Sequence, residues 1–132
     1  MKHLLICLML ILFLLMDFST SRAADRNIYT GSVTGTVIAI SSRTCVFSSI
    51  QFLNTTAAVA YLQVFNLPAA SVTIGTTAPV ASFGVAASGT QTIPFPRDGW
   101  FVGGSGCSVA GTTTRAGSTG ASQDVNIVYE ER

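Results

Sequence analysis

The sequence predicts an all-β protein: a single antiparallel β-sandwich, of jelly-roll or immunoglobulin-like type, with about eight short strands. Short β-branched and apolar segments recur along the chain, with Gly, Pro, Asn and Ser turn signals between them. After the first 23 residues, no segment carries an apolar stripe at helical spacing. Two sheets packed face to face bury such half-apolar strands better than one open sheet does.

Strand character appears in segments bounded by turn residues. Residues 25–30 are polar and predict a loose arm, and residues 111–122 lack apolar periodicity and predict a surface loop. The last strand places Val125, Ile127 and Tyr129 on one face, which predicts that this face is buried. The expected strands are residues 33–40, 43–53, 57–66, 71–74, 79–85, 90–95, 100–102, 107–110 and 124–130.

The best-formed stretch covers residues 43–66, where two apolar runs flank the turn-prone residues 54–56 (NTT). Each run alternates with the period of two that a strand requires. The stretch therefore predicts an antiparallel β-hairpin with Ile50 and Leu62 in the core. Residues 54–56 also form an N-glycosylation sequon, but turn chemistry explains the same residues and is the favoured interpretation.

The chain begins with features of a secretory signal peptide. Lys2 and His3 precede an unbroken apolar run over residues 4–16, and Ala23 offers a small residue for cleavage. A run of 13 residues is too short to cross a bilayer about 30 Å thick. We expect a signal peptide at 1–23, a β-sandwich domain at 24–132 and a secreted or periplasmic location. The alternative is a retained anchor, and membrane contact is expected only through this segment.

Charge argues against a nucleic-acid partner. The chain has seven Lys and Arg and six Asp and Glu. Lys2, Arg22 and Asp17 fall in the predicted signal peptide, so the domain keeps five charges of each sign. A nucleic-acid binder needs a basic surface that neutralises phosphates. We therefore expect no nucleic-acid partner.

Cysteine usage agrees with export. Cys7 lies in the predicted signal peptide, and the domain retains Cys45 and Cys107. An even pair in an oxidising compartment predicts a disulfide, with two buried free thiols as the alternative. The bond requires the two Cα atoms to come within about 7 Å of each other. Both strand starts must then lie at the same end of the sandwich.

The residue inventory excludes most catalytic chemistry. The domain has no histidine and no lysine, which removes Ser-His-Asp, Cys-His, Schiff-base and histidine-zinc arrangements. Asp98 and Asp124 could form a carboxylate pair, but turn and strand-start roles explain both. Glycines in residues 103–106 predict a flexible loop, since no lysine or helix follows as in a phosphate loop. We expect no catalytic residue, metal, cofactor or small-molecule substrate, and hence no enzyme.

Trp100 and Phe101 are the candidate binding residues. They follow a turn signal at residues 97–99 (RDG) and could contact a sugar or a protein partner as exposed aromatics. The alternative is a core tryptophan that caps one end of the sandwich, and it is favoured because large aromatic side chains are usually mostly buried.

Four segments of the chain resemble a set of small bacteriophage-encoded proteins. They are residues 60–66 (AYLQVFN), 71–79 (SVTIGTTAP), 87–89 (ASG) and 124–129 (DVNIVY). In that set, similar strand and turn patterns recur in the same order, and the resemblance covers roughly residues 43–129.

The resemblance implies a virion-associated β-sandwich, of decoration, head-fibre or tail-surface type, which assembles with copies of itself or docks on a particle. Virion proteins assembled in the cytoplasm have no use for a signal peptide. We therefore expect a prophage-derived or host-adapted version, located on the virion surface if it is phage-encoded. A carbohydrate- or surface-binding module that uses Trp100 and Phe101 is the alternative, with a glycan as its partner.

Overall fold

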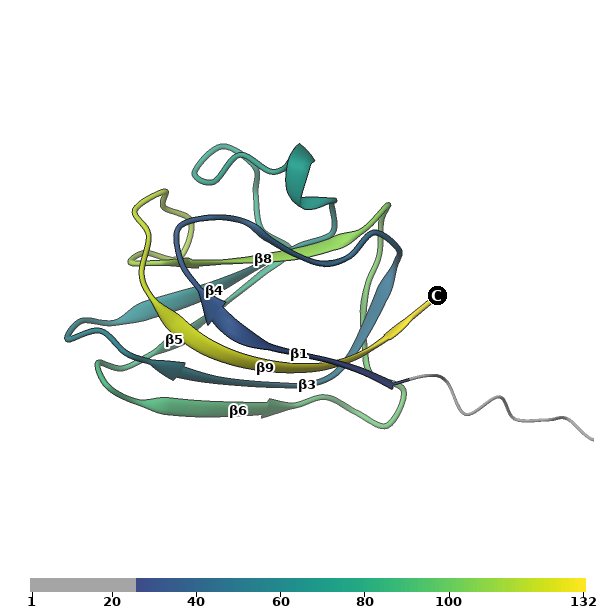
Figure 1. Ribbon diagram of the computed structural model, residues 1–132, viewed down its shortest axis with the longest axis horizontal. Coiled ribbons are helices and arrows are strands. Elements are labelled where there is room, and N and C mark those ends of the chain that lie inside the picture. The colour runs from purple at the N-terminus through teal and green to yellow at the C-terminus, as the bar shows by residue number, and fades with distance from the viewer. Residues whose placement is uncertain (1–25) are drawn as a thin grey trace, which may run out of the picture.

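The computed structural model describes residues 26–132, and the predicted signal peptide at 1–23 lies outside the described residues (Figure 1). The described chain is built from strands and one turn of 3-10 helix. The elements are β1 (Arg26–Val33), β2 (Ile38–Ser41), β3 (Cys45–Asn54), β4 (Ala60–Phe65), η1 (Ala69–Ser71), β5 (Ala81–Val85), β6 (Thr90–Pro94), β7 (Trp100–Val102), β8 (Cys107–Thr112) and β9 (Gln123–Glu131).

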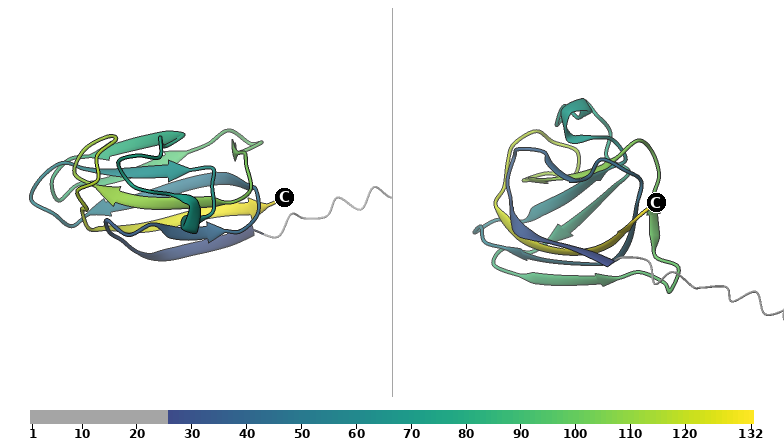
Figure 2. Two further views of the ribbon diagram at one scale, coloured as in Figure 1. Left: turned by 90° about the horizontal axis from the view of Figure 1, so that it is seen from above. Right: turned by 45° about the vertical axis from the view of Figure 1, so that its right-hand side comes forward.

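The strands form two antiparallel sheets that face each other as the layers of a β-sandwich (Figures 1 and 2). Sheet A has the order β1-β9-β3-β6, with the short β7 also paired to β3. Sheet B has the order β2-β8-β4-β5. The predicted all-β sandwich is therefore confirmed.

The pairing is nested, and this nesting defines the topology. The first and last strands along the chain, β1 and β9, pair with each other. Moving inward along the chain, β2 pairs with β8, β3 with β6, and β4 with β5. A long antiparallel ribbon rolled into two facing sheets has this pattern, which is the jelly roll. Of the two sandwich types that the sequence predicts, the structure has the jelly roll.

The predicted hairpin over residues 43–66 is wrong. Its two halves form β3 and β4, but β3 belongs to sheet A and β4 to sheet B. The connection after Asn54 crosses from one sheet to the other instead of turning back beside β3. Two strands with period-2 alternation fit a hairpin and a crossing equally well, because each presents one apolar face in both arrangements. Pairing with β9 and β8 decides between them.

Three further segments differ from the prediction. The expected strand at residues 33–40 is not continuous, because Val33 ends β1 and β2 begins only at Ile38. Residues 26–30 of the expected loose arm belong to β1, which pairs with β9 along all eight of its residues. Its polar sequence is typical of an edge strand with one exposed face, so main-chain pairing decides the structure here. The expected strand at residues 71–74 is wrong, since η1 ends at Ser71 and a turn follows.

The core lies between the inward faces of the two sheets. Ile50 and Leu62 are fully buried, as predicted. Val125, Ile127 and Tyr129 of β9 are also buried, which confirms the predicted face of the last strand. The largest fully buried apolar side chains are Phe47, Phe52, Phe65, Ile50, Leu62 and Ile127.

A β-bulge in β3 explains why its core-facing residues are not all odd-numbered or all even-numbered. Phe47 pairs with Tyr129 and Ser49 pairs with Val128, so Ser48 is an extra residue in the strand. An extra residue reverses the alternation of the residues that follow it. Phe47 and Ile50 can therefore both face the core.

Candidate interaction surfaces

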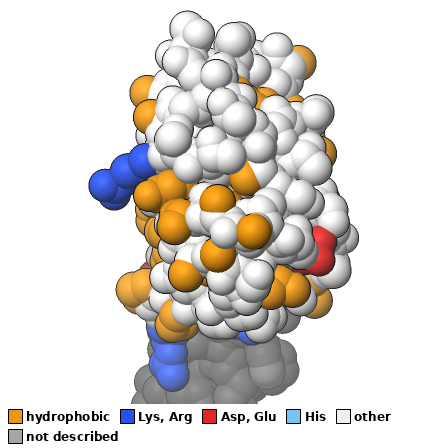
Figure 3. Space-filling view, turned by 90° about the vertical axis from the view of Figure 1, so that its left-hand side faces the viewer, with side chains coloured by type: hydrophobic (Ala, Val, Ile, Leu, Met, Phe, Trp, Pro, Cys, Tyr) orange, Lys and Arg blue, Asp and Glu red, His pale blue; other side chains and the backbone are white. Residues whose placement is uncertain are grey.

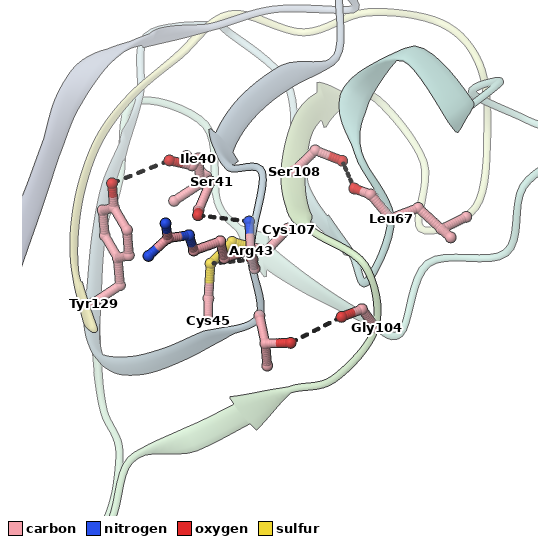
Figure 4. The surroundings of a disulfide bond; sticks show 10 residues. Ile40, Ser41, Arg43, Cys45, Leu67, Gly104, Cys107, Ser108 and Tyr129 are labelled. Atoms are coloured by element: carbon pink, nitrogen blue, oxygen red, sulfur yellow. Dashed lines mark hydrogen bonds between the residues drawn. A yellow bond between two sulfur atoms is a disulfide. The ribbon is translucent and has the colours of Figure 1, made fainter. Parts of the chain in front are cut away.

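The predicted disulfide between Cys45 and Cys107 is present, with a Cα–Cα distance of 6.1 Å. Cys45 begins β3 in sheet A and Cys107 begins β8 in sheet B. The bond therefore joins the two sheets at one end of the sandwich. Figure 4 shows the surroundings of this bond. Nearby, Thr44 Oγ1 donates to the carbonyl of Gly104 at 2.8 Å.

Tyr129 makes a second link between the sheets near the disulfide. Its hydroxyl donates to the carbonyl oxygen of Ile40 at 3.0 Å, which connects β9 of sheet A to the end of β2 in sheet B (Figure 4). Burial raises the pKa of Tyr129 above its ordinary value, and the negative charge of Glu131 adds to the shift. The phenol is therefore held neutral in the folded protein.

This shift predicts a loss of stability at high pH. Tyr129 ionises at a pH near 10 in the unfolded chain and at a higher pH in the folded chain. Between these two values the folded state holds one proton more, so the free energy of unfolding falls as pH rises, by at most about 1.4 kcal/mol per pH unit. We expect the stability difference between the wild type and Tyr129→Phe to shrink as pH rises above about 10. Urea denaturation at a series of pH values measures it, and a difference that does not change with pH would contradict the expectation.

Trp100 lies in an aromatic cluster between the strands β5 and β7, at one side of the sandwich. Its ring centroid is 5.3 Å from that of Phe95, 5.8 Å from Phe83 and 5.9 Å from Phe47. Three ring neighbours leave Trp100 only partly exposed. This is the packing of a side chain that closes the gap between two edge strands. Ligand binding at Trp100 and Phe101 stays a prediction, and the main chain of Phe101 pairs with Val46.

Asn54, the first residue of the sequon, is fully buried at the other end of β3. Its amide nitrogen donates to the carbonyls of Ala58 at 2.6 Å and Ala86 at 2.9 Å. Its side-chain oxygen accepts from the main-chain N–H of Thr56 at 2.9 Å. The turn role predicted for Asn54 is therefore confirmed in a crossing rather than a hairpin. A glycan on the same nitrogen would replace one of its two hydrogens, so at least one of the two donated bonds would be lost.

The hydrogen bonds of Asn54 also tie two connections together. The crossing from β3 to β4 and the turn from β5 to β6 meet here, because the N–H of Ser88 donates to the carbonyl of Thr56 at 3.0 Å. The N–H of Asn54 likewise donates to the carbonyl of Gly89 at 2.9 Å. Both connections are therefore held in one arrangement.

Apolar side chains gather on the surface of these joined connections (Figure 3). Val59 is 48% exposed and Leu53 is 39% exposed, and the alanines beside them are exposed as well. Residues 53–59 and 85–90 contain no charged side chain. We call this surface the apolar tip, and its residues are Leu53, Ala57, Ala58, Val59, Ala86 and Ala87.

The outer face of sheet B is covered by the chain itself. Gln63 of β4 points outward yet is fully buried, and its Nε2 donates to the carbonyl of Gly117 at 3.1 Å. The hydroxyl of Ser108 in β8 donates to the carbonyl of Leu67 at 2.9 Å. The expected surface loop at residues 111–122 is therefore corrected: its first two residues belong to β8, and the rest covers this sheet.

The outer face of sheet A carries no such cover from the described residues. It holds a shallow hollow of about 360 Å³. Asn126 lines this hollow, and its side-chain oxygen is buried without a hydrogen-bond partner in the part of the chain that the structure describes. The residues around the hollow are Thr30, Gln51, Phe52, Leu53, Thr90, Asp124, Val125 and Asn126.

The structure does not bring the two candidate carboxylates together. Asp124 pairs with Leu53 near the end of β3, whereas Asp98 precedes Trp100, which pairs with Phe47 near its start. Six residues of strand between these positions correspond to about 20 Å. Within residues 26–132, no group of three or more His, Cys, Asp or Glu side chains could hold a metal ion. No helix in this range is long and apolar enough to cross a membrane.

The glycines near residue 104 allow close packing of the main chain, so the predicted flexible loop is corrected. Gly104 has a φ of +117°, a conformation that L side chains rarely adopt, and a side chain there would collide with the carbonyl of Asn66. A Cβ on Gly106 would lie 3.0 Å from the nitrogen of Pro68. These glycines let the segment before β8 lie against residues 66–68.

The fold and these surfaces define a disulfide-linked jelly-roll domain with one covered sheet face, one uncovered sheet face and an apolar tip. Comparisons with protein-family models, with curated proteins and with solved structures found no match.

Proposed function

We propose that this protein is an exported, non-catalytic interaction module that docks on a larger protein assembly through its apolar tip. The observation that carries the proposal is the exposure of Val59 and Leu53 on two joined connections that contain no charged side chain, with Asp124 beside Leu53 at the border of this surface. Apolar residues on one such surface, with polar residues around it, are typical of a protein contact.

The rigidity of the tip supports this role. Asn54 joins both connections of the tip through its donor bonds to Ala58 and Ala86. A surface that is already ordered loses little conformational entropy when a partner binds. The tip is therefore better suited to docking than two independent loops of the same composition.

Export and assembly on a particle are part of the same proposal. The disulfide between Cys45 and Cys107 suits a secreted or periplasmic protein, because thiols stay reduced in the cytosol. The jelly roll is shared by viral capsid domains and lectins, which is an analogy of fold alone. Together with the sequence resemblance, it supports a decoration protein on a virion-like particle, of phage or prophage origin.

Co-sedimentation tests the proposal. The mature chain, residues 24–132, is mixed with the particle fraction of the culture that produces it and centrifuged. We expect the wild type to sediment with the particles and Val59→Asp to remain in the supernatant, because docking would bury the new charge. Thr92→Asp on sheet A is the matched control, since Thr92 is exposed but lies outside the tip.

Two outcomes would overturn docking through the tip. Val59→Asp could sediment as well as the wild type, or the wild type could stay in the supernatant and bind immobilised neutral glycans instead. The second outcome would favour the glycan-binding alternative. In that case Asn126→Ala, at the hollow of sheet A, and a Trp100 variant would show which surface holds the sugar.

A further inference from the structure

The two sheets end in edge strands, and these edges differ in how they are protected. Sheet A ends in β1 on one side and in β6 and β7 on the other, and sheet B ends in β2 and β5. An edge strand presents unpaired main-chain N–H and C=O groups, which can pair with another chain. Folded proteins block this pairing with short strands, prolines, bulges or covering loops.

All edges except β1 carry such a block. β2 has four residues and an irregular register between Ala39 and Ser41. β6 ends at Pro94, with Pro96 close behind, and β7 has only three residues. β5 has five residues, and the loop at residues 115–116 lines the same surface hollow as its first residues.

β1 has none of these blocks. It is eight residues long, pairs with β9 in unbroken register, and contains no proline and no lysine. Among the described residues, the main chain of β1 makes no hydrogen bond to main chain other than that of β9. Ile28, in the first half of the strand, is 66% exposed and is the most exposed of the large apolar side chains described.

We propose that β1 pairs antiparallel with β1 of a second copy of this chain, which makes the two A sheets one continuous sheet. A twofold axis relates the copies, so each contact occurs twice. The inference goes beyond docking through the tip, and neither depends on the other.

Charge complementarity indicates the register. Arg26, Ile28 and Ser32 share the outer face of sheet A, and the Ser32 hydroxyl donates to the carboxylate of Asp124 on the neighbouring strand. If Tyr29 lies on the twofold axis, seven residues pair, and Arg26 lies opposite Ser32 of the second copy.

In this register the Arg26 guanidinium faces the second copy's Asp124 across two strand spacings, or roughly 10 Å between the main chains. The arginine and aspartate side chains bridge that span between them. Arg26 is available for this contact, because its side chain is 69% exposed and only approaches Glu130, at 3.8 Å. Ile28 lies opposite Thr30 of the second copy and loses its exposure to water. A second copy therefore offers this edge both main-chain pairing and opposite charge.

Light scattering after size-exclusion chromatography tests the pairing on the oxidised mature chain, over about 10–500 µM. We expect the wild type to form a dimer in this range. Arg26→Asp and Asp124→Arg should each weaken dimerisation about tenfold, since the exposed charge pair occurs twice by symmetry. The double variant Arg26→Asp with Asp124→Arg should recover most of the lost affinity. Ile28→Lys should be monomeric.

Arg97→Asp is the control, because Arg97 is exposed in the turn before β7, a strand that pairs with β3 and is separated from β1 by β3 and β9. It should dimerise like the wild type. A thermal unfolding scan and the absence of free thiols verify that each variant is folded. A monomeric wild type at 500 µM or so, a dimer that survives Ile28→Lys, or a double variant that is no better than its single parents would overturn the proposal. Val59→Asp should dimerise like the wild type, which distinguishes pairing through the β1 edge from docking through the apolar tip.

Discussion

Replacing both Cys45 and Cys107 with alanine is expected to lower the free energy of unfolding by about 4 kcal/mol. The disulfide closes a loop with a sequence separation of 62 residues, and its loss frees the unfolded chain from that constraint. It also removes the covalent link between the sheets at the end where β3 and β8 begin. A loss of this size is a large part of the roughly 5–15 kcal/mol that stabilises a typical domain.

Urea denaturation of the oxidised wild type and the double alanine variant measures this loss. Thiol labelling of the unfolded, non-reduced wild type provides the control, and no thiol should react. Two reactive thiols per chain would show that the bond does not form in the natural protein. A change below about 1 kcal/mol would show that the loop is already constrained in the unfolded state.

Asn54→Ala is expected to cost about 3 kcal/mol, because it removes three hydrogen bonds of a fully buried side chain, two donated to Ala58 and Ala86 and one accepted from the N–H of Thr56. The amide nitrogen of Asn54 serves Ala58 in the crossing and Ala86 after β5. Its removal therefore loosens both connections. We expect hydrogen exchange in residues 54–59 and 85–89 to accelerate more than exchange in β9.

Asn54→Asp separates the donor role from the acceptor role. The carboxylate can still accept from Thr56, but it cannot donate to Ala58 or Ala86. At pH 7 we expect Asn54→Asp to lower the free energy of unfolding at least as much as Asn54→Ala does. Below about pH 4 we expect a smaller decrease, because a protonated carboxyl can donate a hydrogen bond. Thr55→Ala is the matched control, since Thr55 is an exposed neighbour whose hydroxyl makes a single exposed hydrogen bond, to the carbonyl of Ser122, and its loss should cost about 1 kcal/mol or less. Equal stability of Asn54→Ala and the control would contradict the proposed role of Asn54.

These two predictions concern opposite ends of the same strand. β3 begins at Cys45 and ends at Asn54, so the disulfide and the amide link sheet A to sheet B about 30 Å apart. The amide link also orders the surface proposed to dock. Asn54→Ala should therefore weaken co-sedimentation with particles in the same direction as Val59→Asp, although it leaves the exposed side chains in place.

Local properties of the sequence determined the fold class and much of the core. Period-2 alternation predicts the buried face of β9 correctly, because side chains on a strand point alternately to its two faces whatever the partner is. The disulfide between Cys45 and Cys107 could be predicted because the domain has only these two cysteines and the expected export leads to an oxidising compartment. The turn role of Asn54 is likewise a property of its side chain, which can bond to nearby main chain.

Only the tertiary structure decided which strands are neighbours, and with them the candidate surfaces. β3 and β4 alternate in the same way whether they form a hairpin or cross between sheets, and the polar β1 is a strand only because β9 pairs with it. The apolar tip combines two connections roughly 30 residues apart, which Asn54 joins through Ala58 and Ala86. The open edge depends on the order of strands in sheet A. Contacts between residues so distant in sequence leave no local pattern, because their energy is realised only when the whole sandwich has formed.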